Sequence, residues 1–134
     1  MLLTRASEYA LLSLVALAKS DKPLDAESLS HELDISRSFL AKILQSLARQ
    51  KIISSFKGVN GGFALNENSL QSTILQIMYA AEGKNPTVFE CSPSKSSCPS
   101  DRASTCQIWP FVNRLQGKID AFLGTLTLQD ILEA

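Results

Sequence analysis

Residues 35–65, ISRSFLAKILQSLARQKIISSFKGVNGGFAL, decide the fold that this sequence predicts. In the first half, four apolar residues recur at the i, i+3, i+4, i+7 spacing of one helix face. They are Leu40, Ile43, Leu44 and Leu47. Ser36 is suited to cap this helix, which should end near residue 50. In the second half, strand-like residues at 51–56 and 63–65 flank a loop with three glycines, so a β-hairpin should follow the helix.

Two further helices are predicted before this stretch. The first covers residues 4–20, with Thr4 as its N-cap, and it is apolar on more than one face. The second starts after Asp25, its N-cap, and ends near Leu33. Three helices followed by a two-stranded hairpin is the element order of a winged helix-turn-helix. We therefore expect a mainly α fold in which residues 1–66 form a winged helix-turn-helix with a two-stranded wing.

A connecting helix and a loop are predicted next. The helix covers 69–82 within a connecting region at 67–83, and Gly83 should end it. Residues 84–106 show no periodicity and hold all three cysteines, six serines and three prolines. A segment of that length without secondary structure is typical of a functional or a disordered segment. We interpret it as a sensor loop.

The C-terminal region, residues 107–134, is predicted to form a long helix and a short one. Pro110 suits the first turn of the long helix, and Thr127 suits the cap of the short one. Apolar residues alternate in steps of four and three, the rhythm of a coiled-coil seam. They are Ile108, Val112, Leu115, Ile119, Phe122 and Leu126. A domain of this size cannot cover so long a seam, so we interpret this as the dimerisation helix of a homodimer.

The charge of the chain is balanced overall but uneven along its length. The 134 residues include 13 Lys+Arg and 13 Asp+Glu. Residues 37–60 contain five basic residues and no acidic one, which leaves 8 basic against 13 acidic, a net of −5, elsewhere. A basic segment on an acidic body is typical of phosphate binding.

Several classes of protein are disfavoured by the sequence. No apolar run reaches the roughly 18 residues of a membrane span. The N-terminus lacks the pattern of a signal peptide, and an odd number of cysteines does not suit a disulfide framework. We therefore expect a cytoplasmic protein without a membrane partner. The absence of a phosphate loop, a nucleophile motif and a paired acid–base constellation argues against an enzyme.

The third helix and the wing carry the candidate DNA-binding residues. Helical spacing places several polar side chains opposite the leucine stripe, and the tip of the wing adds two more. The candidates are Arg37, Ser38, Phe39, Lys42, Gln45, Arg49, Lys57 and Asn60. Together with a dimeric seam, they predict binding to double-stranded DNA at an inverted repeat. The alternative is a winged-helix module that binds protein through a solvated basic helix.

The cysteines, in the pattern Cys91-x6-Cys98-x7-Cys106, lack the paired Cys-x2–4-Cys spacing of zinc ribbons and fingers. Three thiolates on one loop could hold three corners of an iron–sulfur cluster, with a fourth ligand from elsewhere. His31, the sole histidine, lies in the second predicted helix and is interpreted as an exposed helical side chain. The alternative is a set of cluster-free thiols that oxidise to a switch disulfide.

Three motifs resemble the family of transcription regulators that contains IscR, NsrR, RirA and CymR. They are LTRASEYAL at residues 3–11, ISRSFLAKIL at 35–44 and GVNGGFAL at 58–65. The cysteine loop and the terminal TLQDIL at 127–132 extend the resemblance over essentially the whole chain. It implies a bacterial homodimeric transcription regulator with a long C-terminal dimerisation helix.

The resemblance also implies a 2Fe–2S or 4Fe–4S cluster bound through Cys91, Cys98 and Cys106. IscR-like members place a histidine ligand shortly after the third cysteine, whereas Gln107, Ile108 and Trp109 follow it here. Glu8 falls where NsrR-like members carry an acidic ligand donated by the opposite subunit. The expected function is a regulator that senses redox state, nitric oxide or iron–sulfur status. A cluster-free regulator that senses thiol oxidation or a protein partner is the alternative.

Overall fold

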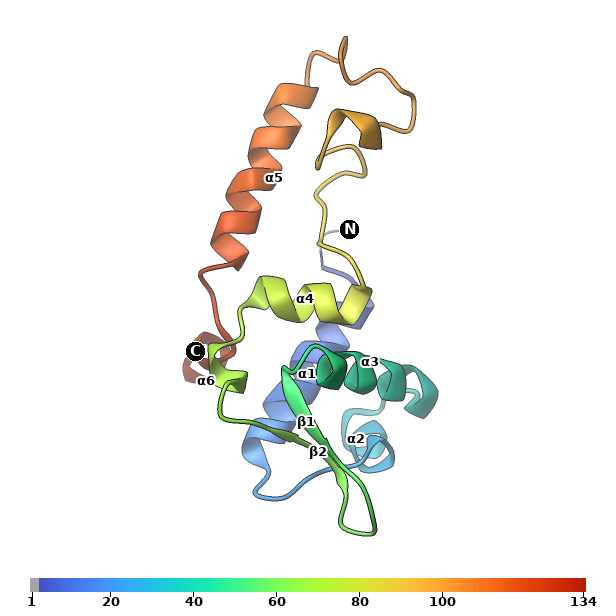
Figure 1. The fold of residues 1–134 in the computed structure, drawn as a ribbon, viewed down its shortest axis with the longest axis vertical. Coiled ribbons are helices and arrows are strands. Elements are labelled where there is room, and N and C mark those ends of the chain that lie inside the picture. Colours follow the sequence, from blue (N-terminus) through green and yellow to red (C-terminus); the bar gives the residue numbers. More distant parts are fainter. Residues whose placement is uncertain (1–2) are drawn as a thin grey trace.

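The computed structural model describes residues 3–134, and its fold is mainly helical with one two-stranded sheet. The elements are α1 (Arg5–Lys19), α2 (Ala26–Leu33), α3 (Arg37–Arg49), β1 (Ile53–Phe56), β2 (Gly62–Leu65), η1 (Ser69–Gln71), α4 (Ile74–Glu82), η2 (Lys95–Ser97), α5 (Trp109–Leu123) and α6 (Leu128–Glu133). Figure 1 shows a head built from α1, α2, α3, α4 and the sheet, and an arm in which residues 84–106 run alongside α5. The predicted winged helix-turn-helix is confirmed.

Most helix starts lie where the sequence predicts them, because side-chain caps fix them. The side chains of Thr4, Asp25 and Thr127 accept hydrogen bonds from backbone N–H groups in the first turns of α1, α2 and α6. Each cap satisfies a donor that has no partner inside its helix. Ser36 occupies the N-cap position of α3 but makes no such bond. Its hydroxyl instead lies 3.2 Å from the hydroxyl of Ser38.

The wing is an antiparallel hairpin in which Ile53 pairs with Leu65 and Phe56 pairs with Gly62. Its first strand starts two residues later than predicted, since Lys51 has a φ of 64° and turns the chain out of α3. Leu24 and Phe63 exchange backbone hydrogen bonds of 2.9 and 2.8 Å, which attach the hairpin to the segment before α2. This attachment fixes the wing relative to the helices of the head.

The predicted helix at 69–82 is wrong in its first turns. The chain forms the short helix η1, breaks, and starts again as α4, where Thr73 and Gln76 form a reciprocal capping box. The break is stabilised by hydrogen bonds to residues that are distant in the sequence. Ser72 accepts a hydrogen bond from the N–H of Leu128, and the N–H of Ile74 donates to Leu126. These two bonds tie the C-terminal helix α6 to the start of α4.

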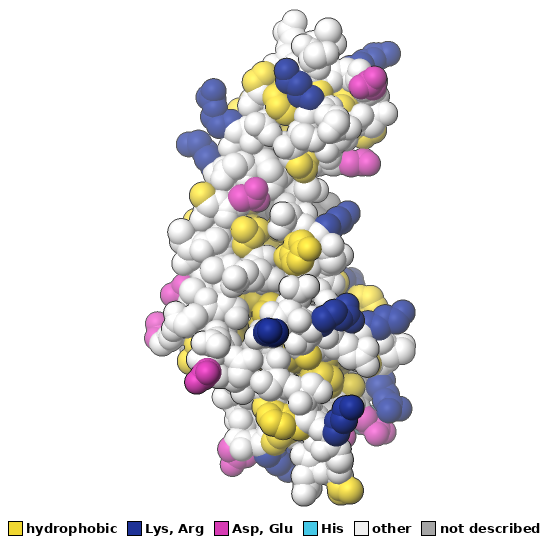
Figure 2. Space-filling model, viewed as in Figure 1, with side chains coloured by type: hydrophobic (Ala, Val, Ile, Leu, Met, Phe, Trp, Pro, Cys, Tyr) yellow, Lys and Arg dark blue, Asp and Glu magenta, His cyan; other side chains and the backbone are white. Residues whose placement is uncertain are grey.

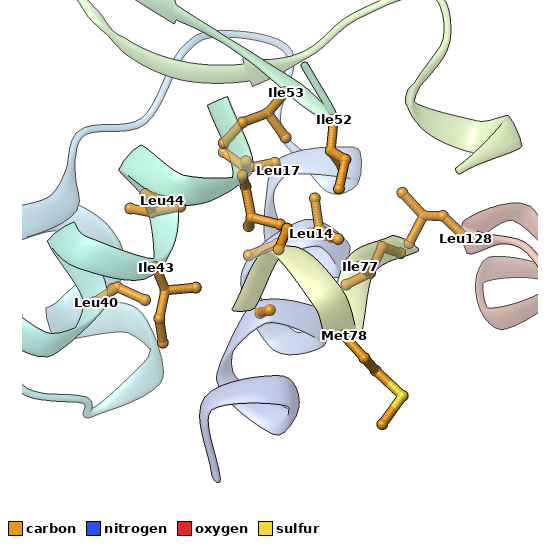
Figure 3. Close-up of a cluster of buried hydrophobic side chains, with 14 of the residues drawn as sticks. Leu14, Leu17, Leu40, Ile43, Leu44, Ile52, Ile53, Ile77, Met78 and Leu128 are labelled. Carbon is orange, nitrogen blue, oxygen red and sulfur yellow. The ribbon is translucent and has the colours of Figure 1, made fainter. Parts of the chain in front are cut away.

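The core of the head lies where α1, α3 and α4 meet, as Figure 3 shows. Leu40, Leu44 and Leu47 of α3 are fully buried, which confirms the leucine stripe. Leu14 from α1 and Ile77 from α4 are also fully buried. A side chain of this kind contributes about 1.5–3 kcal/mol by leaving water, so the three-helix contact stabilises the head.

Helix α5 differs from the predicted seam at several positions. Val112 is 2 % exposed and belongs to the interior of its own chain. Leu126 lies beyond the end of the helix at Leu123 and packs against the core. The large apolar residues that α5 and its N-cap do expose are Ile108, Phe111 and Phe122, each more than 60 % accessible. The apolar face available to a partner is therefore shorter than the sequence pattern predicts.

No helix in residues 3–134 is long and apolar enough to cross a membrane.

Candidate functional site

Helix α3 presents a basic surface on the side away from the core. Every candidate on this helix is exposed, whereas its leucine stripe is buried. The exposed candidates are Arg37, Ser38, Phe39, Lys42, Gln45 and Arg49. Figure 2 shows Lys and Arg side chains gathered over the side of the head where α3 lies. The segregation of charge predicted from the sequence is thus present on the folded surface.

Phe39 differs from the other candidates because its ring packs against an aromatic side chain of another helix. Its ring packs edge-on against Tyr9 of α1, with centroids 5.6 Å apart and an interplanar angle of 88°. Arg5 donates a 3.4 Å hydrogen bond to the hydroxyl of Tyr9. A hollow of about 400 Å³ lies here, lined by Arg5, Tyr9, Ser36, Ser38, Phe39 and Lys42. Arg5 therefore adds to the basic surface a charge that the sequence analysis did not include.

The tip of the wing is fully available to solvent. Lys57 and Asn60 are exposed, and Val59 between them is completely accessible. The turn is closed by a 3.0 Å hydrogen bond from the N–H of Gly61 to the carbonyl of Gly58. The wing thus offers a cation and an amide at the far end of a short, tethered hairpin.

The three cysteines lie in the arm, each half-buried and none in a disulfide. Within residues 3–134, no three His, Cys, Asp or Glu side chains form a group that could hold a metal ion. Glu8 is exposed on the first turn of α1. The described chain therefore does not bring the four predicted ligands together. The donor set itself, three accessible thiols on one loop, fits the thiolate ligation that iron–sulfur clusters require.

Cys98 has the most distinctive environment of the three. The backbone N–H of Arg102 lies 3.4 Å from its Sγ and donates to it. This bond and a second from the N–H of Ser100 hold the pKa of the Cys98 thiol below its usual range. Hydrogen bonds that favour a charged form lower the pKa of the group that accepts them. The loop therefore raises the fraction of Cys98 present as thiolate, the form that binds metals and reacts with oxidants.

Gln116 connects the loop to α5 and was missed by the sequence analysis. It is 5 % exposed, and its amide pairs with the loop on both sides. Its Oε1 accepts from the N–H of Val88 at 2.8 Å and from the hydroxyl of Ser92 at 2.6 Å. Its Nε2 donates to the carbonyl of Pro86 at 3.0 Å. A polar residue one turn after Val112 on the inward face of α5 was the available signal.

Comparison with known proteins agrees with this arrangement. Residues 3–134 match the Rrf2 family, described as iron-dependent transcriptional regulators. The chain is 24 % identical to the transcriptional regulator IscR of Photorhabdus laumondii, over 98 % of this chain and 79 % of that protein. These relatives are transcriptional regulators rather than enzymes.

Solved structures share the fold. CymR, the global cysteine regulator of B. subtilis, superposes with a TM-score of 0.69 at 21 % identity, covering 97 % of this chain and 95 % of that one. IscR of T. potens superposes with a TM-score of 0.67 at 19 % identity, covering 97 % and 85 %. Because the family match covers nearly every residue, the chain belongs to the Rrf2 family of winged-helix transcriptional regulators.

Proposed function

We propose that this regulator binds double-stranded DNA as a homodimer at an inverted-repeat operator, through α3 and the wing. The observation that carries the proposal is the exposed face of α3 within a 24-residue segment, 37–60, that has no acidic residue. The N-terminal end of a recognition helix is the part that reaches the base edges in helix-turn-helix proteins. Arg37 and Ser38 stand at that end, and Lys57 and Asn60 suit contact with the backbone or the minor groove.

In this proposal the chain has four regions with different roles. Residues 1–66 bind DNA, and residues 67–83 connect this region to the rest of the chain. Residues 84–106 form the sensor loop, and residues 107–134 hold two subunits together. The exposed Ile108, Phe111 and Phe122 support the last assignment, because a second copy would cover them. Two heads joined in this way would address two half-sites one or two helical turns apart.

The proposed signal is the state of an iron–sulfur cluster held by Cys91, Cys98 and Cys106, with Glu8 of the opposite subunit as the fourth ligand. The accessible thiols and the lowered pKa of Cys98 support this assignment. When bound, the cluster would supply sensitivity to redox state or nitric oxide. The carboxylate would be the ligand most easily displaced from it. Affinity for the operator changes only if the DNA-binding and non-binding states hold the cluster differently.

A cluster-free thiol sensor is the second candidate. The three cysteines do not form a metal-holding group in the described residues, and hydrogen bonds within the loop lower the pKa of the Cys98 thiol. A structural neighbour, CymR of S. aureus, is known in an oxidised form. In this candidate, oxidation of a thiol replaces cluster loss as the event that changes operator affinity.

The deciding measurement is the absorption spectrum of protein purified without oxygen, with iron, sulfide and zinc assayed on the same sample. Visible charge-transfer bands with comparable iron and sulfide support the cluster. A sample that stays colourless after reconstitution favours the thiol sensor. Zinc alone contradicts both assignments of the loop. Cys98→Ala should abolish the bands while Ser97→Ala keeps them, and unchanged bands in Cys98→Ala would remove that residue from the ligand set.

A further inference from the structure

Three polar side chains of α5 hold the backbone at one cysteine. Trp109, Asn113 and Gln116 stand at i, i+4 and i+7, so they share one face of the helix. Trp109 Nε1 donates to the carbonyl of Cys91 at 3.0 Å. Asn113 Nδ2 donates to the carbonyl of Ser92 at 2.8 Å. Gln116 accepts from the hydroxyl of Ser92 at 2.6 Å, so two consecutive loop residues are tied to one helix face.

Burial makes this attachment strong. Ser92 is fully buried and Gln116 nearly so, and a buried polar pair that loses one member leaves the other without water as a substitute. The same Gln116 amide also pairs with Val88 and Pro86, which extends the attachment over residues 86–93. Each of these bonds spans 18 to 30 residues in sequence, so the segment cannot move without leaving α5.

The other two cysteines are held differently. In the described chain, the hydrogen bonds of Cys98 and Cys106 stay within four residues: Cys98 pairs with Lys95, Asp101 and Arg102, and Cys106 pairs with Ala103. These are local turns, which open at low free-energy cost compared with bonds that join distant, buried groups. The ammonium of Lys95 lies 5.5 Å from the ring centre of Trp109, a surface contact between this segment and α5. The loop thus has a fixed half and a locally folded half.

We propose that Trp109, Asn113 and Gln116 are positioning residues that hold Cys91 as a preformed anchor, onto which the segment with Cys98 and Cys106 closes. The inference rests on the proposed cluster-binding function and specifies its order: Cys91 is in place before iron arrives, and the other two thiols move. It also makes α5 the element that senses closure, because the anchor is built on this helix.

The test compares the reduced, metal-free full chain with Trp109→Phe/Asn113→Ala. This variant removes two donors and keeps an aromatic ring at position 109. Arg114→Ala, an exposed change on the same helix, is the matched control. Amide hydrogen exchange should be slower in 86–93 than in 95–106 of the wild type. The double variant should speed exchange of 86–93 by roughly fivefold per lost bond and leave 95–106 unchanged.

Two further readouts separate positioning from general stability. Iodoacetamide should alkylate Cys91 at a different rate in the double variant than in the wild type, because only Cys91 loses its attachment. The alkylation rates of Cys98 and Cys106 should be the same in both proteins. After reconstitution, the visible absorption should decay faster in the variant than in Arg114→Ala. If the double variant unfolds, Trp109→Phe alone provides the same comparison with one donor removed.

The outcomes distinguish this inference from the function on which it rests. The proposal that Cys91 is a preformed anchor would be overturned by either of two results. One is an equal rate of amide hydrogen exchange in 86–93 and 95–106 of the wild type, and the other is an unchanged rate in 86–93 of the double variant. A wild type that never develops visible absorption would overturn the cluster assignment. Slow exchange of 86–93 in that same colourless sample would still support a preformed anchor at Cys91.

Discussion

Gly62 stands at the start of β2 with a φ of +138°, a conformation that side chains with a Cβ rarely adopt. A Cβ there would lie 2.6 Å from the carbonyl carbon and oxygen of Leu24, so backbone would have to move. Gly62→Ala should therefore destabilise the chain by more than about 1 kcal/mol. Thermal unfolding measures the effect, and the wing should detach from the segment before α2.

Gly117 provides the opposite control. It lies inside α5, where a Cβ would meet nothing within 4 Å. Gly117→Ala should raise the free energy of unfolding by about 0.5–1 kcal/mol, because alanine loses less backbone entropy in a helix. If both substitutions lowered the melting temperature equally, the steric argument at Gly62 would lose its support.

The cap of α2 makes a pH-dependent contribution. The N–H of Ser28 donates to Asp25 Oδ1 at 2.7 Å, and this bond holds the pKa of the Asp25 carboxyl below its usual range. A carboxyl whose pKa is lowered on folding stabilises the fold above its unfolded pKa of about 3.9 and loses this as pH falls through the folded pKa. Asp25→Asn keeps a cap without this titration. Its melting temperature should lie below that of the wild type at neutral pH, and the gap should close in acid.

Single residues were predictable where the signal is local. Thr4, Asp25 and Thr127 cap their helices as predicted, because a cap needs only the sequence of its own first turn. Gln116 could not be assigned in this way, since its partners in the loop lie 24 or more residues away. Its role depends on which face of α5 meets the loop, and that is a tertiary property.

At the scale of elements, the proposal that α3 binds DNA can be tested directly. Lys42 is exposed in the middle of its outer face, opposite the buried leucines. Lys42→Ala should weaken binding to duplex DNA and reduce the slope of log affinity against log salt by about 1, the loss of one phosphate contact. Lys118→Ala on α5 is the control, because this lysine is exposed far along the chain from α3.

Binding titrations at several salt concentrations measure both quantities. Equal slopes for Lys42→Ala and the wild type would show that Lys42 contacts no phosphate. A Lys118→Ala slope that falls as well would indicate a general charge effect in place of a defined surface.

Element boundaries followed the sequence except where distant residues decide them. The predicted helix at 69–82 is interrupted because Ser72 and Ile74 bond to the chain around α6. The seam on α5 is shortened because Val112 turns inward to the arm. Periodicity identifies an apolar face, but it does not state whether that face meets its own chain or another.

At the scale of the whole molecule, dimerisation is the property to test. Phe122 is 62 % exposed on α5, a large apolar surface for a monomer to leave in water. Phe122→Glu should convert the proposed dimer into a monomer, because burying an unpaired carboxylate at an interface is strongly unfavourable. Arg114→Glu changes charge at an exposed polar position of the same helix and should stay dimeric. Light scattering gives the molar mass. A Phe122→Glu variant that remains a dimer would show that the interface lies elsewhere.

The cysteines mark the limit of sequence reasoning for the complete molecule. Their number and their place on one loop were evident from the sequence, as was the fold that carries them. Their separation was not, because residues 94–106 fold by local turns whose relative positions the sequence pattern does not encode. The role proposed for Glu8 requires a second subunit, so the sequence pattern of one chain does not reveal it.

The unequal attachment of the loop also bears on how such proteins diversify. A segment whose hydrogen bonds close within a few residues tolerates insertions and deletions, since no distant pairing is broken. The interval between Cys91 and Cys106 can therefore lengthen or shorten over evolutionary time at little expense to the fold. Residues 86–93 have no such freedom, because Pro86, Val88, Cys91 and Ser92 must keep their register with α5. The position of Cys91 is thus tied to the rest of the fold, whereas the spacing of Cys98 and Cys106 can change under selection for a new signal.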